Sequence, residues 1–314
     1  MQNIQITLFG HVHVVHPNGS APLRLTHGMQ ALFAYLLLHQ HLVPREVLMD
    51  VFWLDDSPER ARSSLTTAIW RLRQLLEPSD VRPGTYLITQ TSGEVGFNWD
   101  CGHWLDTKAF EQQVYPLLRK PVPYLTGDDV ERIEEGMTLY RGELLEGIYD
   151  DWALRERERF RTLHLNCLTR LMEFHASRNN FEQGIAYGHE ILRRDPVREE
   201  IHRGLMRLYL ESGQRALAIH QYTRCRELLE QELGLLPLEE TQALYQQIMS
   251  SPFSGGPTSG HLLTQEIAQL MHDLQRVKQS LDATNETLAK ITGAVTRLGN
   301  GGKEGRMAAH TQNR

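Results

Sequence analysis

The first 25 residues alternate hydrophobic and polar positions, which is the pattern of short β-strands with one face in solvent. Residues 17–20 read Pro-Asn-Gly-Ser and are typical of a turn. The chain is therefore predicted to open with a small antiparallel sheet. Its apolar positions are Ile4, Ile6, Leu8, Val12 and Val14 before the turn, and Leu23 and Leu25 after it.

Three helical stripes follow. The first helix carries Leu32, Tyr35, Leu36 and Leu38. The second runs from Pro44, which suits the first position of a helix, to Phe52. The third begins near Ser57-Pro58 and stops at Pro78, and its apolar residues fall at i, i+4, i+7 and i+11. These residues, expected to face the core, are Leu65, Ile69, Leu72 and Leu76.

A hairpin is predicted after the third helix. Residues 86–88 and 95–97 are apolar and flank a Ser92-Gly93 turn. A sheet, three helices and a hairpin within about 100 residues is the order of elements in a winged helix-turn-helix. We expect an α+β domain of this kind over residues 1–103.

Residues 104–250 are almost entirely helical in pattern, and a period of 34 residues runs through them. With Pro196 closing one repeat, the next unit matches the tetratricopeptide pattern at Leu205, Tyr209, Gly213, Ala218 and Tyr222. The preceding unit matches less well, at Leu171, His175, Gly184 and Gly188. The alternative is a generic helical bundle. Small residues that recur where helices must approach closely favour repeats. We expect the repeats to form a packing unit that is independent of DNA contact.

The C-terminal part is predicted to contain a linker, a coiled coil and a tail. Residues 251–260 are rich in Gly, Ser and Pro, and residues 299–314 resemble a disordered tail. Between them, residues 261–298 alternate apolar spacings of four and three, the period of a coiled coil. The alternative is an amphipathic helix that docks on its own protein. The residues expected to drive oligomerisation are Ile267, Leu270, Leu274, Val277, Leu281, Leu288, Ile291, Val295 and Leu298.

The predicted elements make the chain as a whole mostly α-helical. Its composition is that of a globular protein and gives no general sign of nucleic-acid binding. The 314 residues carry a formal net charge of −6, whereas a dedicated nucleic-acid binder often has a basic domain. Three cysteines fit a reducing compartment. The sequence has neither a signal peptide nor an apolar run of about 20 residues, so we expect a cytoplasmic protein without membrane contact.

The third helix concentrates the positive charge that the whole chain lacks. From Arg60 to Leu76 it has four arginines and no acidic residue. Arginine and small polar side chains suit a helix in the major groove, although a solvated basic face is a common alternative. The candidate DNA-binding residues on this helix are Arg62, Ser63, Thr66, Thr67, Trp70, Arg71, Arg73 and Gln74.

These segments together resemble a known family. Residues 69–73, Ile-Trp-Arg-Leu-Arg, are similar to the recognition-helix signature of OmpR/PhoB-type winged helices. Residues 8–10, 52–53 and 84–87 fit the same pattern. Residues 104–249 then resemble the bacterial transcriptional activation domain of the SARP regulators, which activate secondary-metabolite genes. The matching pieces are residues 139–145, 195–199, 205–209, 212–215 and 232–234.

The resemblance implies binding to promoter repeats and recruitment of RNA polymerase. By position, Arg71 and Arg73 take the DNA-contact roles of the family, and Thr85 and Tyr86 lie at its wing. Trp70 stands where a small or basic residue is usual, and Leu87 replaces a basic residue common after the wing tyrosine. The wing is therefore expected to bind phosphate less than in relatives.

Enzymatic function is not expected, because the sequence contains no Walker loop, no G-x-S-x-G and no H-E-x-x-H. We likewise expect no cofactor and no metal. The competing function is an oligomeric repeat scaffold whose winged helix binds protein. The salt dependence of binding to promoter DNA distinguishes the two functions, since only a DNA reader loses affinity steeply as salt rises.

Overall fold

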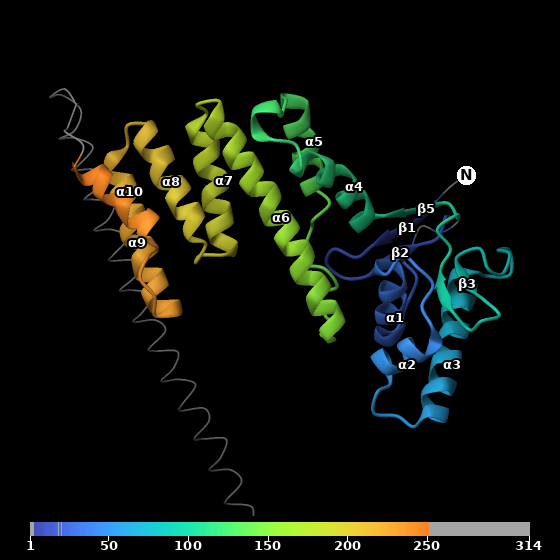
Figure 1. Ribbon diagram of the computed structural model, residues 1–314. Helices are drawn as coiled ribbons and strands as arrows, with labels where there is room; N and C mark the ends of the chain where they lie inside the picture. Colours follow the sequence, from blue (N-terminus) through green and yellow to red (C-terminus); the bar gives the residue numbers. More distant parts are fainter. Residues whose placement is uncertain (1–2, 18, 20, 251–314) are drawn as a thin grey trace, which may run out of the picture. The chain divides into compact units, whose positions relative to one another are not determined.

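The computed structural model describes residues 3–17, 19 and 21–250. The linker, the coiled-coil segment 261–298 and the tail, with all the oligomerisation residues, lie outside the described residues. Within residues 3–250, the chain is mostly helical, with small sheets confined to the N-terminal part (Figure 1).

A three-stranded sheet forms one side of the N-terminal domain. Strand β1 (Ile4–Thr7) lies in the centre, antiparallel to β2 (His13–Val15) and parallel to β5 (His103–Leu105). The predicted pairing of β1 and β2 is present, whereas Leu23 and Leu25 form no strand. Leu23 contributes one backbone bond to Val14 instead. The third strand comes from a segment about 100 residues away, so the domain boundary predicted at 103 falls inside β5.

Three helices follow in the predicted order, α1 (His27–Leu38), α2 (Arg45–Phe52) and α3 (Pro58–Leu76). Pro44 occupies the N-cap position of α2, one residue before the first helical residue, Arg45. Ser57 caps α3 because its hydroxyl accepts the amide of Arg60, and Pro58 follows as the first helical residue. Leu65, Ile69, Leu72 and Leu76 of α3 are all buried, as the periodicity predicts.

The hairpin, or wing, consists of β3 (Leu87–Thr89) and β4 (Val95–Phe97), with Leu87 opposite Phe97. Gly93 closes the turn at a φ of +94°, a conformation that costs glycine little. Val95 also exchanges two backbone hydrogen bonds with Val43. The wing is thereby attached to the segment that leads into α2.

The remaining helices form the predicted helical region. Helices α6 to α10 lie side by side in chain order, each packed on the next (Figure 1). Tyr209 is buried on α8 with its hydroxyl bonded to His189 of α7, and Tyr222 of α9 stacks on Tyr245 of α10. Both tyrosines therefore lie between neighbouring helices. The elements are α4 (Asp106–Leu118), η1 (Val122–Tyr124), α5 (Gly127–Met137), α6 (Asp151–Ser177), α7 (Phe181–Arg194), α8 (Glu199–Glu211), α9 (Arg215–Leu233) and α10 (Glu239–Ser250).

Glycines allow α6, α7 and α8 to approach closely. A Cβ on Gly188 of α7 would lie 2.6 Å from Cδ2 of Leu205 and 3.3 Å from Sδ of Met172. A Cβ on Gly184 would lie 3.2 Å from Leu208, and one on Gly204 would lie 2.7 Å from Met172. These contacts are the structural reason for Gly184 and Gly188, two small residues of the repeat pattern.

Replacing Gly188 with alanine is therefore expected to destabilise the protein. Overpacking of this kind costs about 1–3 kcal/mol, which exceeds the gain of roughly 0.5–1 kcal/mol from alanine in a helix. Urea unfolding measures the difference. Gly127→Ala at the start of α5 is the matched control, since nothing lies within 4 Å of its Cβ position. A Gly188→Ala variant as stable as this control would contradict the expected clash.

Two hydrophobic cores hold the described residues together. One includes the sheet, α1 and α3, and continues without a break into α4, α5 and α6, where it extends from Trp152 to Phe174. Phe9 of the N-terminal domain packs edge-on against Phe110 and Phe160, and Tyr35 packs against Trp152. The other core lies among α6 to α10. The core of the first 103 residues is thus completed by residues of α4, α5 and α6.

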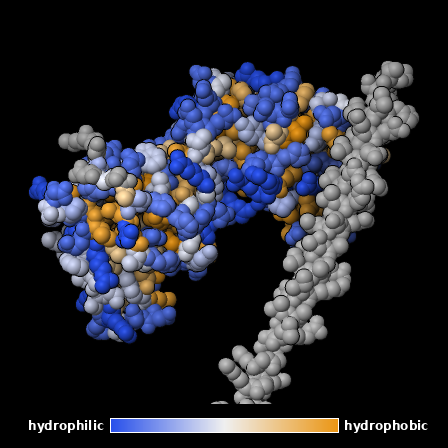
Figure 2. Space-filling model, turned by 180° about the vertical axis from the view of Figure 1, so that it is seen from behind, coloured by the Kyte–Doolittle hydropathy of each residue, from blue (hydrophilic) through white to orange (hydrophobic). Residues whose placement is uncertain are grey.

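The surface is mainly polar. Hydrophilic side chains cover most of the face seen in Figure 2, with apolar side chains showing between them. Over residues 3–250, every helix is too short or too polar to span a bilayer.

Candidate DNA interface

The face of α3 opposite its buried stripe is an open surface of polar, basic and aromatic side chains. The most apolar of them, Trp70, is 60% exposed. Because a helix turns by about 100° per residue, the residues that lie about half a turn from the buried apolar stripe point away from the core. The exposed members, all anticipated from the sequence, are Arg62, Ser63, Thr66, Thr67, Trp70, Arg71 and Gln74. We call them the α3 face.

Two threonines of the α3 face already use their hydroxyl protons. Thr66 donates to the carbonyl of Arg62 at 2.8 Å, and Thr67 donates to that of Ser63 at 2.9 Å. These bonds fix the hydroxyls toward the helix. A nucleic acid would therefore meet their methyl groups and the remaining lone pairs of the oxygens.

The two arginines of the recognition signature occupy different environments. Arg71 is exposed, and its guanidinium has no partner among residues 3–250. Arg73 is half-buried: Nη2 donates to the carbonyl of Leu87 and to the hydroxyl of Thr89, both at 3.1 Å. Its Nε lies 3.4 Å from a carboxylate oxygen of Glu77. The structure thus gives Arg73 the role of attaching α3 to the wing.

Glu77, which the sequence pattern did not single out, is the centre of this attachment. Its buried carboxylate accepts the amides of Tyr86 at 2.8 Å, Leu87 at 3.0 Å and Gly84 at 3.0 Å. Three backbone donors and one arginine satisfy a charge that would otherwise be costly to bury. The available signal was an acid four residues after Arg73 and directly before a proline, which alone does not predict a wing anchor.

The two wing residues proposed from the sequence are not both on the surface. Tyr86 is 6% exposed and packs edge-on near His16, with ring centroids 6.0 Å apart. Thr85 is half-buried, and its hydroxyl donates to the carbonyl of Arg82 at 2.6 Å. Arg82 is itself exposed. A nucleic acid next to the wing would meet Arg82 and the turn residues 89–92 before Tyr86.

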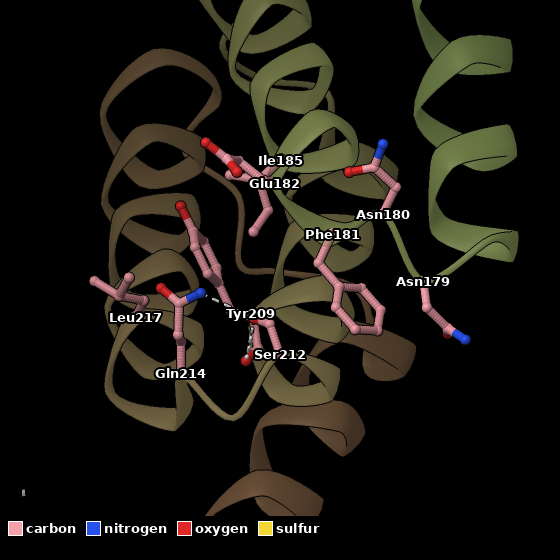
Figure 3. A pocket seen from close by; sticks show the side chains of 9 residues that line it. All are labelled: Asn179, Asn180, Phe181, Glu182, Ile185, Tyr209, Ser212, Gln214 and Leu217. Atoms are coloured by element: carbon pink, nitrogen blue, oxygen red, sulfur yellow. Dashed lines mark hydrogen bonds between the residues drawn. The ribbon is translucent and has the colours of Figure 1, made fainter. Parts of the chain in front are cut away.

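A separate hollow of about 600 Å³ lies among the repeats. Figure 3 shows Phe181, Ile185, Tyr209 and Leu217 around it, with Asn179, Asn180, Glu182 and Gln214 adding polar groups. It is built from the loop before α7, from α7 itself and from the ends of α8 and α9 that face it.

Comparisons with known proteins agree with both halves of the chain. Residues 105–249 match the bacterial transcriptional activator domain. The regulatory protein AfsR of Streptomyces coelicolor is 25% identical over 226 residues, which are 71% of this chain and 22% of AfsR. The transcriptional regulatory protein MoaR1 of Mycobacterium tuberculosis is 24% identical over 225 residues, 70% of this chain and 71% of MoaR1. This chain thus spans about a fifth of AfsR.

A solved structure has the same fold. Mycobacterium tuberculosis EmbR, determined in complex with a low-affinity phosphopeptide, aligns with a TM-score of 0.68 at 18% identity. The alignment covers 81% of this chain and 67% of that of EmbR. Residues 105–249 of the chain thus match the bacterial transcriptional activator domain. Over about 70% of its length, the chain is a distant homologue of the regulatory protein AfsR and of the transcriptional regulatory protein MoaR1.

Proposed function

We propose that this protein is a sequence-specific, DNA-binding transcriptional activator that inserts α3 into the major groove of promoter repeats. The observation that carries the proposal is the α3 face, which exposes two arginines and five other side chains opposite a fully buried apolar stripe. A helix of 19 residues anchored along its inner side presents such a face as a rigid unit. The family of the domain that follows it supports a role in transcription.

Within this interface, Arg71 is proposed as the principal base reader. Its guanidinium is exposed and unpaired among the described residues, so it loses no internal bond when it forks onto a guanine edge. Arg62 and Gln74 extend the same face in both directions along the helix. Trp70 supplies an exposed apolar surface that suits a thymine methyl group or a sugar. Arg73 is proposed to act indirectly, by holding the wing against α3.

Arg71→Ala is expected to weaken operator binding by about 1–3 kcal/mol and to relax the sequence preference at one position. Fluorescence anisotropy with operator fragments, selected from genomic DNA by pull-down, measures both effects. Arg132→Ala is the matched control, because this arginine is also exposed but lies on α5. Equal affinities of wild type and a folded Arg71→Ala variant would exclude α3 as the reader.

The alternative is an oligomeric scaffold whose winged helix binds protein. The net charge of −6 is compatible with this scaffold, because a negatively charged protein is not attracted to DNA in general. A DNA reader that neutralises several phosphates loses affinity linearly in log salt, whereas a protein-binding winged helix has no such dependence on DNA. Binding of operator fragments at several salt concentrations therefore separates the two functions.

RNA polymerase is the proposed partner of the helical repeats. The hollow among α7, α8 and α9 supports this, because its apolar side chains and its amide groups can pack against and hydrogen-bond a segment of another protein. A cytoplasmic location follows from the same proposal, since transcription takes place there in bacteria.

We also propose that the heptad pattern of residues 261–298 makes the full-length protein at least a dimer. Linked DNA-binding domains bind tandem half-sites more tightly without new contacts. Deleting residues 261–298 is expected to lower both the mass of the particle in solution and the affinity for tandem sites. Light scattering on the two proteins measures the mass. A monomeric full-length protein at micromolar concentration would contradict the proposal.

A further inference from the structure

A second, smaller cavity of about 130 Å³ lies next to the segment that connects α5 with α6. Its walls come from three parts of the chain: this connecting segment, the middle of α6 and the end of α7. The residues that line it are Tyr140, Glu143, Arg161, His164, Leu165 and Arg194. None of them belongs to the α3 face or to the wing.

His164 is a buried polar side chain that the fold leaves unsatisfied. It is 4% exposed, its ring lies 4.4 Å from that of Tyr140, and its Nδ1 has no hydrogen-bond partner among the described residues. Burial, with the nearby charge of Arg194, lowers the pKa of His164 to about 4, so the imidazole is neutral at pH 7. Buried polar atoms without a partner are rare and call for an explanation.

Two arginines give the cavity a positive lining. Arg194 uses its Nε to bind Glu190 at 2.9 Å, while its two Nη atoms have no partner over residues 3–250. Arg161 donates from Nη2 to the carbonyl of Arg194 at 2.7 Å, and its Nη1 lies 3.5 Å from Glu158. Both side chains are a little over a third exposed and therefore reach solvent.

Glu143 is the one acid among the residues that line the cavity, while Glu158 and Glu190 pair with the two arginines from outside the lining. Glu143 is 57% exposed and lies 3.9 Å from Arg157, which partly neutralises it. The lining therefore keeps a net positive charge, with the hydroxyl of Tyr140 and the imidazole of His164 as further hydrogen-bonding groups. Arginine forks match the oxygens of phosphate and carboxylate groups.

We propose that this cavity binds a small oxyanion, namely a phosphate or carboxylate group, held by Arg161, Arg194 and His164. Its volume equals about four water molecules, which admits such a group but not a whole nucleotide. A larger ligand would place only its anionic end here and leave the rest in solvent. His164 would then donate a hydrogen bond from the nitrogen that now has none.

The position of the cavity gives the bound anion a regulatory role. The connecting segment is hydrogen-bonded to the winged helix, with the amide of Gly10 donating to the carbonyl of Glu143 at 2.8 Å. Tyr140 packs against Phe9 at 4.9 Å. An anion held between Arg194 of α7 and this segment links the repeats to the DNA-binding domain. The anion changes how the repeats and the DNA-binding domain are arranged only to the extent that it binds one arrangement more tightly than another.

Titration of the full-length protein with inorganic phosphate, and separately with malonate, at constant ionic strength tests the proposal. Calorimetry reports saturable binding, and ¹H–¹⁵N spectra report the His164 ring, assigned with a His164→Gln variant. Arg194→Gln is expected to weaken binding at least about tenfold, the effect of losing one charge-assisted bond. Arg161→Gln is expected to act similarly.

Arg193→Gln is the matched control, because Arg193 pairs with the same Glu190 but does not line the cavity. If phosphate alone binds, the cavity is specific for a phosphate group, and if malonate alone binds, it is specific for a carboxylate. If both bind, the cavity accepts either group. The proposal is overturned if neither anion gives saturable binding and a shift of His164, or if Arg193→Gln weakens binding as much as Arg194→Gln. None of these measurements requires DNA, so their outcome is independent of the proposed DNA binding.

Discussion

Replacing Phe160 with alanine is expected to lower the free energy of unfolding by about 3–5 kcal/mol, the usual cost of truncating a buried phenylalanine. Phe160 lies on α6 and is fully buried. Its ring packs edge-on against Phe9 at 5.3 Å and lies 6.5 Å from Phe110. Because Phe9 belongs to the winged helix, the cavity left by the substitution opens inside the core of the N-terminal domain.

Hydrogen exchange of the full-length protein shows which helices and strands are destabilised by the substitution. Amides of β1 and α1 are expected to exchange faster in Phe160→Ala, together with those of α4 and α6. Tyr124→Ala on η1 serves as the control, since Tyr124 is 70% exposed. Faster exchange in α6 while β1 and α1 keep their protection would argue against a shared core. For the same reason, a fragment of residues 1–103 is expected to show no cooperative unfolding.

The second large effect is expected at Asp106, where a buried carboxylate supports the start of the same core. It is 2% exposed and accepts the amides of Leu8 and Phe9, both at 2.9 Å, and of Thr107 at 2.7 Å. Asp106→Ala leaves these three donors without an acceptor. Since one unsatisfied buried donor costs about 1–3 kcal/mol, a loss of roughly 3 kcal/mol or more is expected.

The carboxyl group of Asp106 is also expected to make the stability of the protein depend on pH. Burial outweighs the backbone hydrogen bonds and raises the pKa of Asp106 from 3.8 to about 6. A raised pKa means that the folded state binds the proton more tightly than the unfolded state. The contribution of Asp106 is therefore full below about pH 4 and is lost as the pH rises through about 6.

Urea unfolding of wild type and Asp106→Ala between pH 4 and pH 7 measures this difference. The stability gap between the two proteins should be largest near pH 4 and shrink toward pH 7. Asp100→Ala is the control, because Asp100 is exposed six residues earlier, and such surface substitutions usually stay within about 0.5 kcal/mol. A gap that stays constant across this range would show that Asp106 titrates at its ordinary pKa.

The shared core also bears on how the regulator can work. Phe9, Tyr35 and Leu8 are held by residues of α4, α6 and the segment before α6, so the winged helix does not turn freely against these elements. A ligand that binds at α6 or at the connecting segment would thereby lie next to the strand β1 of the N-terminal domain. The small cavity at His164 lies beside that segment.

Several features of the candidate site could be read from local pattern. The α3 face follows from the spacing of four buried apolar residues, because the helix period alone determines which side chains point outward. The Ser57-Pro58 start of α3 and the Ser92-Gly93 turn follow from capping and turn chemistry, which also act over a few residues. For the same reason the order of sheet, helices, hairpin and helical repeats was predictable.

The tertiary structure decided what depends on residues far apart in the chain. Arg71 and Arg73 look alike in the sequence, yet only Arg73 is bonded to Leu87 and Glu77 at the wing. Tyr86 is buried although its turn position suggests exposure. The parallel pairing of β5 with β1, the core shared with Phe160 and the unsatisfied nitrogen of His164 likewise come from contacts between distant segments. Contacts between distant segments produce no periodic pattern in the sequence. Helix periods, caps and turns depend on neighbouring residues and can therefore be predicted from the sequence.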